Sequence, residues 1–256
     1  MELKITIVQT DLTWEDKVAN LQMLDQKLEQ ISRSDLIVLP EMFTTGFSMN
    51  AVHLAEDMQG KSIQWMINQA KKKQAVLTGS LIIKENEQYF NRMLWVQPDG
   101  SLENYDKRHL FGMANESSTY TSGQQHKIVQ YKNWKIALFI CYDLRFPVWN
   151  RNSKDYDLAI YVANWPSKRS AHWKALLQAR AIENQAYVVA VNRVGKDANG
   201  FEHSGDSSLI DPAGQIIYQK AWDEEIYSCV LRKETLKEIR EKLPFLGDRD
   251  TFQIID

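Results

Sequence analysis

The sequence has 256 residues, of which 44% are hydrophobic and 25% are charged, as in ordinary water-soluble globular proteins. Its net charge of −2 argues against nucleic-acid binding, and no apolar stretch is long enough to cross a membrane. The two cysteines lie far apart and lack the spacing of metal ligands, so we expect no disulfide framework and a location in the reducing cytoplasm. We find no repeat or linker and expect a single domain over residues 1–256.

The first part of the chain predicts a βαβ unit. Residues 4–8 form an apolar, β-branched run typical of a strand, and residues 35–39 form a second one. Between them, apolar residues at helical spacing over 18–31 predict a helix that begins at a capping box formed by Thr13 and Asp16. Two strands joined in this way should be parallel, with a right-handed crossover, as in α/β proteins.

The middle of the chain predicts a second helix and then a meander of strands. Apolar residues at helical spacing fall within 63–70. Strands are expected at 75–83, 89–96 and 102–105, and the turn signal Pro-Asp-Gly at 98–100 joins the last two.

Charged residues at the ends of these predicted strands are candidates for a site. Glu41 directly follows the strand at 35–39 and stands beside Phe43, in apolar surroundings that suit a general base better than a solvated surface charge. Lys107 follows the last strand of the meander and precedes apolar residues. The polar loop 112–123 that comes next contains Glu116, and a loop of this length inside a compact domain is often functional.

Cys141 ends an apolar run, 135–140, that predicts a strand buried on both faces. The residues after it predict a turn and the start of a helix, which would expose the thiol to substrate beside backbone N–H groups. An isolated cysteine is more often a small buried hydrophobic residue, so partners elsewhere must support a catalytic role.

Glu41 and Lys107 are such partners, because each lies at the predicted carboxyl end of a strand and one face of one sheet can gather all three residues. A thiol nucleophile needs a base to take its proton, and a developing oxyanion needs a cation or an N–H donor. We also expect the cation of Lys107 to lower the pKa of the Cys141 thiol.

The remainder of the sequence continues the alternation of strands and helices. Strands are predicted at 127–131, 134–140, 157–162, 187–191, 207–210, 215–218 and 226–231, and helices at 170–184 and 236–243.

Six motifs are spread over nearly the whole chain. They are Leu-Pro-Glu-Met-Phe at 39–43, Asp-Lys-Arg-His-Leu-Phe at 106–111, Ile-Cys-Tyr-Asp-Leu-Arg-Phe-Pro at 140–147, Ala-Asn-Trp-Pro at 163–166, Arg-Ala-Ile-Glu-Asn-Gln-Ala-Tyr at 180–187 and Gly-Asp-Ser-Ser-Leu-Ile-Asp at 205–211. With these motifs, in this order, the sequence resembles the nitrilase superfamily of carbon–nitrogen hydrolases. The residues after the cysteine are similar to the amidase branch, closest to omega-amidases that act on 2-oxo-acid amides. They differ from true nitrilases, which typically carry Trp, Glu and His there.

The resemblance implies a four-layer α-β-β-α sandwich and a Glu-Lys-Cys triad that uses no metal or cofactor. It implies that Glu41 is the general base and Cys141 the nucleophile. Lys107 would hold the oxyanion together with the backbone N–H of Tyr142, and Glu116 would orient the lysine and the substrate.

Several further residues are candidates for the walls of the substrate pocket. Phe43, Asn164 and Trp165 stand at strand ends, although Trp165 is equally suited to the core or a subunit contact. Arg145 either binds a substrate carboxylate in bidentate fashion or, as buried arginines often do, locks the turn through an ion pair. His109 and His172 have no partner that the sequence identifies.

The function implied is hydrolysis of a small carboxamide through a cysteine thioester, releasing ammonia and a carboxylic acid. The expected activity is that of an omega-amidase on 2-oxoglutaramate or 2-oxosuccinamate, in a homodimer. An N-carbamoyl amino-acid hydrolase or an aliphatic amide hydrolase of the same superfamily is the alternative. From other classes, a non-catalytic relative that binds a metabolite or a partner protein stays open, while a redox thiol is disfavoured because no resolving cysteine lies near Cys141.

Overall fold

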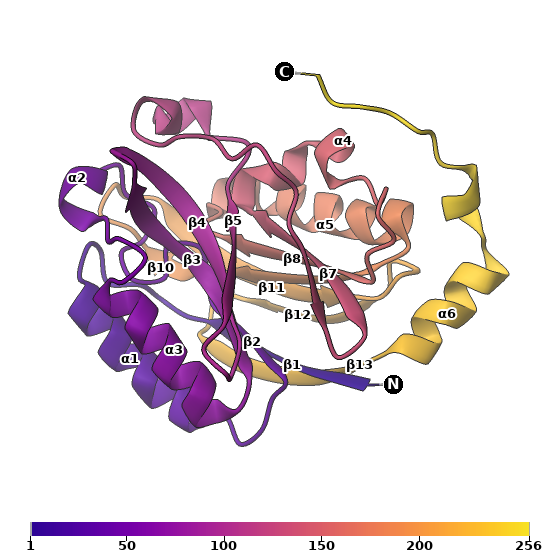
Figure 1. Ribbon diagram of the computed structural model, residues 1–256, viewed down its shortest axis with the longest axis horizontal. Helices are drawn as coiled ribbons and strands as arrows, with labels where there is room; N and C mark the ends of the chain where they lie inside the picture. The colour runs from indigo at the N-terminus through magenta and orange to yellow at the C-terminus, as the bar shows by residue number, and fades with distance from the viewer. Residues whose placement is uncertain (1, 256) are drawn as a thin grey trace.

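Two β-sheets form the centre of the computed structural model, which describes residues 2–255 (Figure 1). The first sheet has the strand order β13-β1-β2-β3-β4-β5, and the second has the order β10-β11-β9-β8-β7-β6, with β12 paired to β11. The strands are β1 (Glu2–Gln9), β2 (Leu36–Val38), β3 (Val76–Glu85), β4 (Gln88–Val96), β5 (Leu102–Asp106), β6 (Ile128–Tyr131), β7 (Trp134–Ile140), β8 (Leu158–Ala163), β9 (Tyr187–Asn192), β10 (Val194–Lys196), β11 (Glu202–Ile210), β12 (Ile216–Ala221) and β13 (Glu225–Arg232).

Each sheet has a parallel centre. In the first sheet, β1, β2 and β3 run parallel, with Leu36 opposite both Ile5 and Val76. In the second sheet, β7, β8 and β9 run parallel, with Leu158 opposite both Ile136 and Tyr187. Parallel strands covered on both faces read as continuous apolar runs, which is why the sequence predicts them well. The expected βαβ unit is confirmed.

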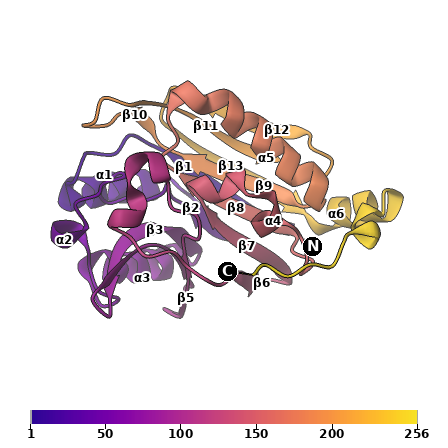
Figure 2. The same ribbon diagram turned by 90° about the horizontal axis from the view of Figure 1, so that it is seen from above.

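Helices cover the outer face of each sheet and complete four layers (Figure 2). Leu24 and Leu28 of α1 and Met66 of α3 are buried in a core with residues of the first sheet. On the other side, Trp173 of α5 is buried in the core that contains the second sheet. The helices are α1 (Lys17–Glu29), α2 (Ala51–Leu54), α3 (Lys61–Lys73), α4 (Pro147–Asn150), α5 (Ser170–Asn184) and α6 (Lys233–Lys242), and the 3-10 helices are η1 (Gly112–Ala114), η2 (Glu116–Ser118), η3 (Cys141–Arg145), η4 (Ser167–Arg169) and η5 (Phe245–Asp248).

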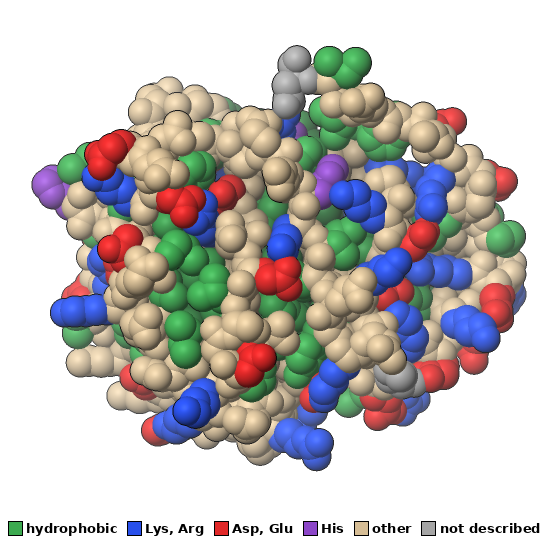
Figure 3. Space-filling model, in the orientation of Figure 1, with side chains coloured by type: hydrophobic (Ala, Val, Ile, Leu, Met, Phe, Trp, Pro, Cys, Tyr) green, Lys and Arg blue, Asp and Glu red, His purple; other side chains and the backbone are tan. Residues whose placement is uncertain are grey.

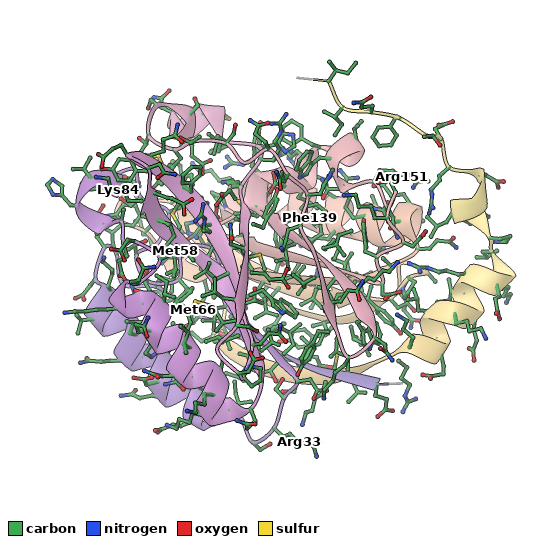
Figure 4. All side chains as sticks on the ribbon, viewed as in Figure 1. Arg33, Met58, Met66, Lys84, Phe139 and Arg151 are labelled. Atoms are coloured by element: carbon green, nitrogen blue, oxygen red, sulfur yellow. The ribbon has the colours of Figure 1, made fainter. Side chains whose placement is uncertain are left out.

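Aromatic side chains fill the space between the two sheets. The ring of Phe139 on β7 lies 6.4 Å from that of Tyr105 on β5 and 5.0 Å from that of Tyr161 on β8, measured between centroids. Figure 4 shows Phe139 between the sheets and Met66 on the α3 side of the first sheet. Truncating one such ring to alanine costs about 3–5 kcal/mol, so this inner layer contributes strongly to the stability of the fold. The expected four-layer sandwich is confirmed.

The start of α1 differs from the sequence prediction. The N-cap is Asp16, whose carboxylate accepts a hydrogen bond from the backbone N–H of Ala19. Thr13 takes no part in a capping box, because the side chain of Asn20 already bonds its backbone N–H and C=O. Asp16 is therefore the side chain that caps this helix, without a reciprocal bond from Thr13.

The surface mixes charges of both signs. Lysine, arginine, aspartate and glutamate side chains are interspersed over the face seen in Figure 3. Within residues 2–255, no helix has the length and apolar character needed to span a bilayer.

Candidate active site

The three residues that the sequence singles out come from two different sheets. Glu41 follows β2 and Lys107 follows β5, both in the first sheet, whereas Cys141 follows β7 in the second. The expectation that one face of one sheet gathers them is therefore wrong. Sheets stacked face to face lie about 10 Å apart, so side chains at the same end of both reach across the gap.

Lys107 is the centre of a buried charge cluster. Its Nζ atom lies 3.1 Å from Oε1 of Glu41 and 3.0 Å from each carboxylate oxygen of Glu116. The three side chains are at most 1% exposed. Burial by itself lowers the pKa of Lys107, but the carboxylates of Glu116 and Glu41 outweigh burial and raise it. The ammonium group therefore stays charged, and it holds two carboxylates that would otherwise repel each other.

The carboxylate of Glu41 is fixed by asparagines from both sheets. Asn91 on β4 donates its side-chain N–H to Oε1 at 2.7 Å. Asn164, just after β8, donates its backbone N–H to Oε2 at 2.7 Å and its side-chain N–H to the backbone carbonyl of Glu41 at 2.6 Å. Hydrogen-bond donors placed in this way fix the orientation of the Glu41 side chain. The sequence analysis did not identify Asn91 as a site residue. A polar amide within an otherwise apolar, buried strand could have indicated it.

Cys141 sits in a strained backbone conformation at the first position of η3, with φ at 44°. A positive φ at a non-glycine residue is uncommon, and it turns the thiol out of the strand toward the opposite sheet. Burial raises the pKa of the Cys141 thiol, and Glu41 adds to this through its charge and a hydrogen bond. Lys107 lowers the pKa only in part, because its ammonium is shared with two carboxylates. Lys107 thus acts on the pKa in the expected direction, but burial and Glu41 outweigh it, so the net pKa of the Cys141 thiol is raised and the thiol form is favoured.

Asp143 holds the turn that carries the nucleophile. Its buried carboxylate accepts hydrogen bonds from the backbone N–H of Ile140 at 3.0 Å and from the hydroxyl of Tyr105 at 2.8 Å. It also contacts His109 twice, through the backbone N–H and ring Nδ1, each at 2.9 Å. The His109 ring stacks on Phe146 at 3.6 Å. These contacts give a role to His109 and tie the turn to both sheets.

A cavity of about 630 Å³ opens onto this cluster. Its walls include Lys107, Cys141, Tyr142, Asn164 and Trp165. The sequence therefore identifies much of the pocket, and Trp165, which is 3% exposed, belongs to the interior of the chain rather than to an outer contact surface. Glu116 lies behind Lys107, where it also accepts the backbone N–H of Phe111 at 2.5 Å.

Phe43 is not part of the pocket, which corrects the sequence prediction. Its side chain is fully buried in the outer core, with its ring 5.9 Å from that of Trp65 on α3. Met42 has φ at 42°, which places the next side chain on the helix side of the sheet. Phe47 lines the cavity instead, with its ring 5.0 Å from Nζ of Lys107.

Arg145 lies in the pocket wall and has no carboxylate partner among residues 2–255. The idea that it locks the turn through a buried ion pair is therefore wrong. Its guanidinium lies 4.7 Å from the centre of the Trp165 ring, and its Nη2 donates to Nδ1 of His172 at 3.2 Å. In the described part of the chain, no three His, Cys, Asp or Glu side chains are grouped to hold a metal ion.

The comparisons with known proteins agree with this geometry. The carbon-nitrogen hydrolase family model matches residues 4–241. The chain is 49% identical to the omega-amidase YafV of Escherichia coli (strain K12), over 98% of each chain, and 32% identical to the 2-oxoglutaramate amidase of Bacillus subtilis (strain 168), over 97% of this chain and 98% of that one. The solved structure of XC1258 from Xanthomonas campestris, a CN-hydrolase superfamily protein with an arsenic adduct in its active site, matches with a TM-score of 0.97 and 42% identity over 99% of both chains.

The chain belongs to the carbon–nitrogen hydrolase family, within the nitrilase superfamily. It is accordingly an enzyme that hydrolyses amides. Nit3 of Saccharomyces cerevisiae, a member of branch 10 of that superfamily, is similar in fold, with a TM-score of 0.84 and 26% identity over 95% of this chain and 94% of that one.

Proposed function

We propose that this protein is an omega-amidase in which Cys141 is the nucleophile, Glu41 the general base and Lys107 the oxyanion-binding cation. The observation that carries the proposal is the ammonium of Lys107, which joins Glu41 to Glu116 on the wall of the same cavity that exposes Cys141. Glu116 keeps the lysine charged and in place. The backbone N–H of Tyr142 is the second oxyanion donor.

In the first half of the reaction, the sulfur of Cys141 attacks the amide carbon as Glu41 takes the thiol proton. A raised thiol pKa makes this base necessary, since little thiolate exists beforehand. The carbonyl oxygen becomes an oxyanion held by Lys107 and by the N–H of Tyr142. Glu41 then gives its proton to the departing nitrogen, the C–N bond breaks, and ammonia leaves behind a thioester.

In the second half, water attacks the thioester carbon as Glu41 takes one of its protons. A second tetrahedral oxyanion forms at the same donors. The C–S bond breaks, the sulfur of Cys141 recovers the proton from Glu41, and the carboxylic acid leaves. One water is consumed, and one ammonia and one acid are formed, so the atoms balance.

The pocket also supports a substrate with a carboxylate at the end remote from the amide. Arg145 lies on the wall without an ion-pair partner among residues 2–255, and a guanidinium binds a planar carboxylate through two parallel hydrogen bonds. Asn164 and Trp165 complete the wall near Cys141. With the names of the similar amidases, this favours 2-oxoglutaramate or 2-oxosuccinamate as substrate. We further propose that residues 1–256 act as one catalytic domain, in a cytoplasmic homodimer.

Ammonia release over a panel of small amides tests the activity. The purified protein should release ammonia faster from 2-oxoglutaramate and 2-oxosuccinamate than from N-carbamoyl amino acids or neutral aliphatic amides. Cys141→Ala should abolish release, while Cys229→Ala, the matched control at the other cysteine, should retain it. Preference for N-carbamoyl compounds would reject the omega-amidase assignment. Substrate that protects Cys141 from alkylation without any ammonia release would indicate a binding protein.

A further inference from the structure

A second arginine, which the sequence did not single out, lies in the same pocket wall. Arg169 ends η4, and its guanidinium lies 5.2 Å from the centre of the Phe111 ring, as that of Arg145 lies 4.7 Å from the ring of Trp165. Both side chains line the cavity that contains Cys141. An aromatic ring that covers the flat face of a guanidinium leaves its N–H edge free for a planar acceptor.

The charge of this arginine pair is not neutralised within residues 2–255. Arg92, Arg180 and Arg193, the buried arginines among residues 2–255, each have a carboxylate within 2.9 Å. Among the described ion pairs, neither Arg145 nor Arg169 has one. Burial lowers the pKa of Arg145, and the nearby charge of Arg169 lowers it further, which shows that the two guanidinium groups repel each other. Two adjacent, partly buried cations without an anion are poorly stabilised until an anionic ligand arrives.

We infer that Arg169 is a specificity-determining residue that, with Arg145, clamps the carboxylate of the substrate and excludes amides that carry an ammonium group beside that carboxylate. The inference rests on the proposed function and extends it. A 2-oxo acid presents the ketone oxygen beside the carboxylate, so both guanidinium groups meet acceptors. The corresponding amino acid presents an ammonium group there, which two guanidinium groups repel.

The acidic side chains at the same cavity do not offset the repulsion between the two guanidinium groups and a substrate ammonium group, because they already accept hydrogen bonds from the protein. Glu15 lines the cavity, but its carboxylate already accepts from Ser48 Oγ at 2.5 Å and from the side chain of Asn50 at 3.3 Å. Asp197 accepts the backbone N–H of Phe201 at 2.9 Å. If these carboxylates did bind an ammonium group, the wild-type protein would hydrolyse L-glutamine well, and the inference would be wrong.

Four amides with the same five-carbon chain separate these effects. Pentanamide has no carboxylate, and glutaric monoamide has one at the end remote from the amide. Relative to glutaric monoamide, 2-oxoglutaramate carries an additional ketone at carbon 2, and L-glutamine carries an ammonium group at that carbon instead. We expect Arg169→Gln to lower the kcat/KM ratio of glutaric monoamide to pentanamide about 10- to 100-fold, mainly through KM, because one charge-assisted contact is lost. The same variant should also lower the kcat/KM ratio of glutaric monoamide to L-glutamine.

Two further variants complete the design. Lys168→Gln removes the neighbouring exposed cation, which does not line the cavity, and should leave both ratios at their wild-type values. Arg169→Lys keeps the charge but loses the planar fork, so it should weaken glutaric monoamide binding while still rejecting L-glutamine. A wild-type protein that prefers pentanamide would overturn the proposed function itself. A wild-type preference for glutaric monoamide that survives Arg169→Gln would overturn only the role of Arg169.

Discussion

Replacing Lys107 by methionine should destabilise the fold in a pH-dependent way. The substitution keeps the length of the side chain and removes the ammonium that Glu41 and Glu116 share at 3.1 and 3.0 Å. Both carboxylates are 0% exposed, so neither can turn to water. Removing one partner from a buried ion pair costs about 3–5 kcal/mol, because the remaining charge is left uncompensated.

The pH dependence follows from the protonation of Glu116. Burial already raises the pKa of Glu116, and Lys107 offsets this in part, so the variant raises the pKa further. Above the ordinary value of 4.5, the folded variant then binds a proton that the unfolded chain does not. The free energy of unfolding therefore falls as pH rises toward the raised pKa, by up to about 1.4 kcal/mol per pH unit for one group. We expect the full loss near pH 8 and a smaller loss near pH 5.5.

Urea unfolding at both pH values measures the effect. The matched control is Lys127→Met, which removes an ion pair to Glu103 with an N–O distance of 2.6 Å. Its side chains are 31% and 39% exposed, and such a pair contributes about 0–1 kcal/mol. A loss of stability in Lys107→Met that is no larger than in Lys127→Met, or that is equal at both pH values, would refute the role of Lys107 as the shared counter-ion of Glu41 and Glu116.

Two other predictions concern the nucleophile. In a Cys229→Ala background, the rate at which iodoacetamide alkylates Cys141 should keep rising with pH beyond 9, because burial raises the pKa of this thiol. A plateau of the alkylation rate below pH 7 would show that Cys141 rests as a thiolate instead. Asp143→Asn should lower kcat about 100-fold with a much smaller change in KM, because an amide cannot accept from Ile140, Tyr105 and His109 together and the turn shifts. Steady-state kinetics on the best amide measures this, and an equal loss in kcat and gain in KM would argue for general disruption of the pocket.

Much of the local structure was accessible from the sequence, because each signal acts over a few residues. Apolar runs at 35–39 and 135–140 became β2 and β7, and the helical spacing around Trp173 became α5. Glu41 and Cys141 stand just past the ends of these runs. Where a signal depended on a side-chain contact, as in the expected capping box at Thr13, it was less reliable, since Asn20 competed for the same backbone groups.

The sequence alone determined that this chain places a carboxylate, an ammonium and a thiol at the ends of separate strands, and the family motifs around them determined the class of chemistry. Only the tertiary structure decided that two facing sheets supply those residues and that Phe43 turns away from the cavity while Phe47 enters it. It also decided that Arg145 and Arg169 face the cavity without an ion-pair partner among residues 2–255, whereas Lys107 lies between the carboxylates of Glu41 and Glu116. The physical reason is that charge pairing and desolvation depend on distances between residues far apart in the chain, which no local pattern encodes.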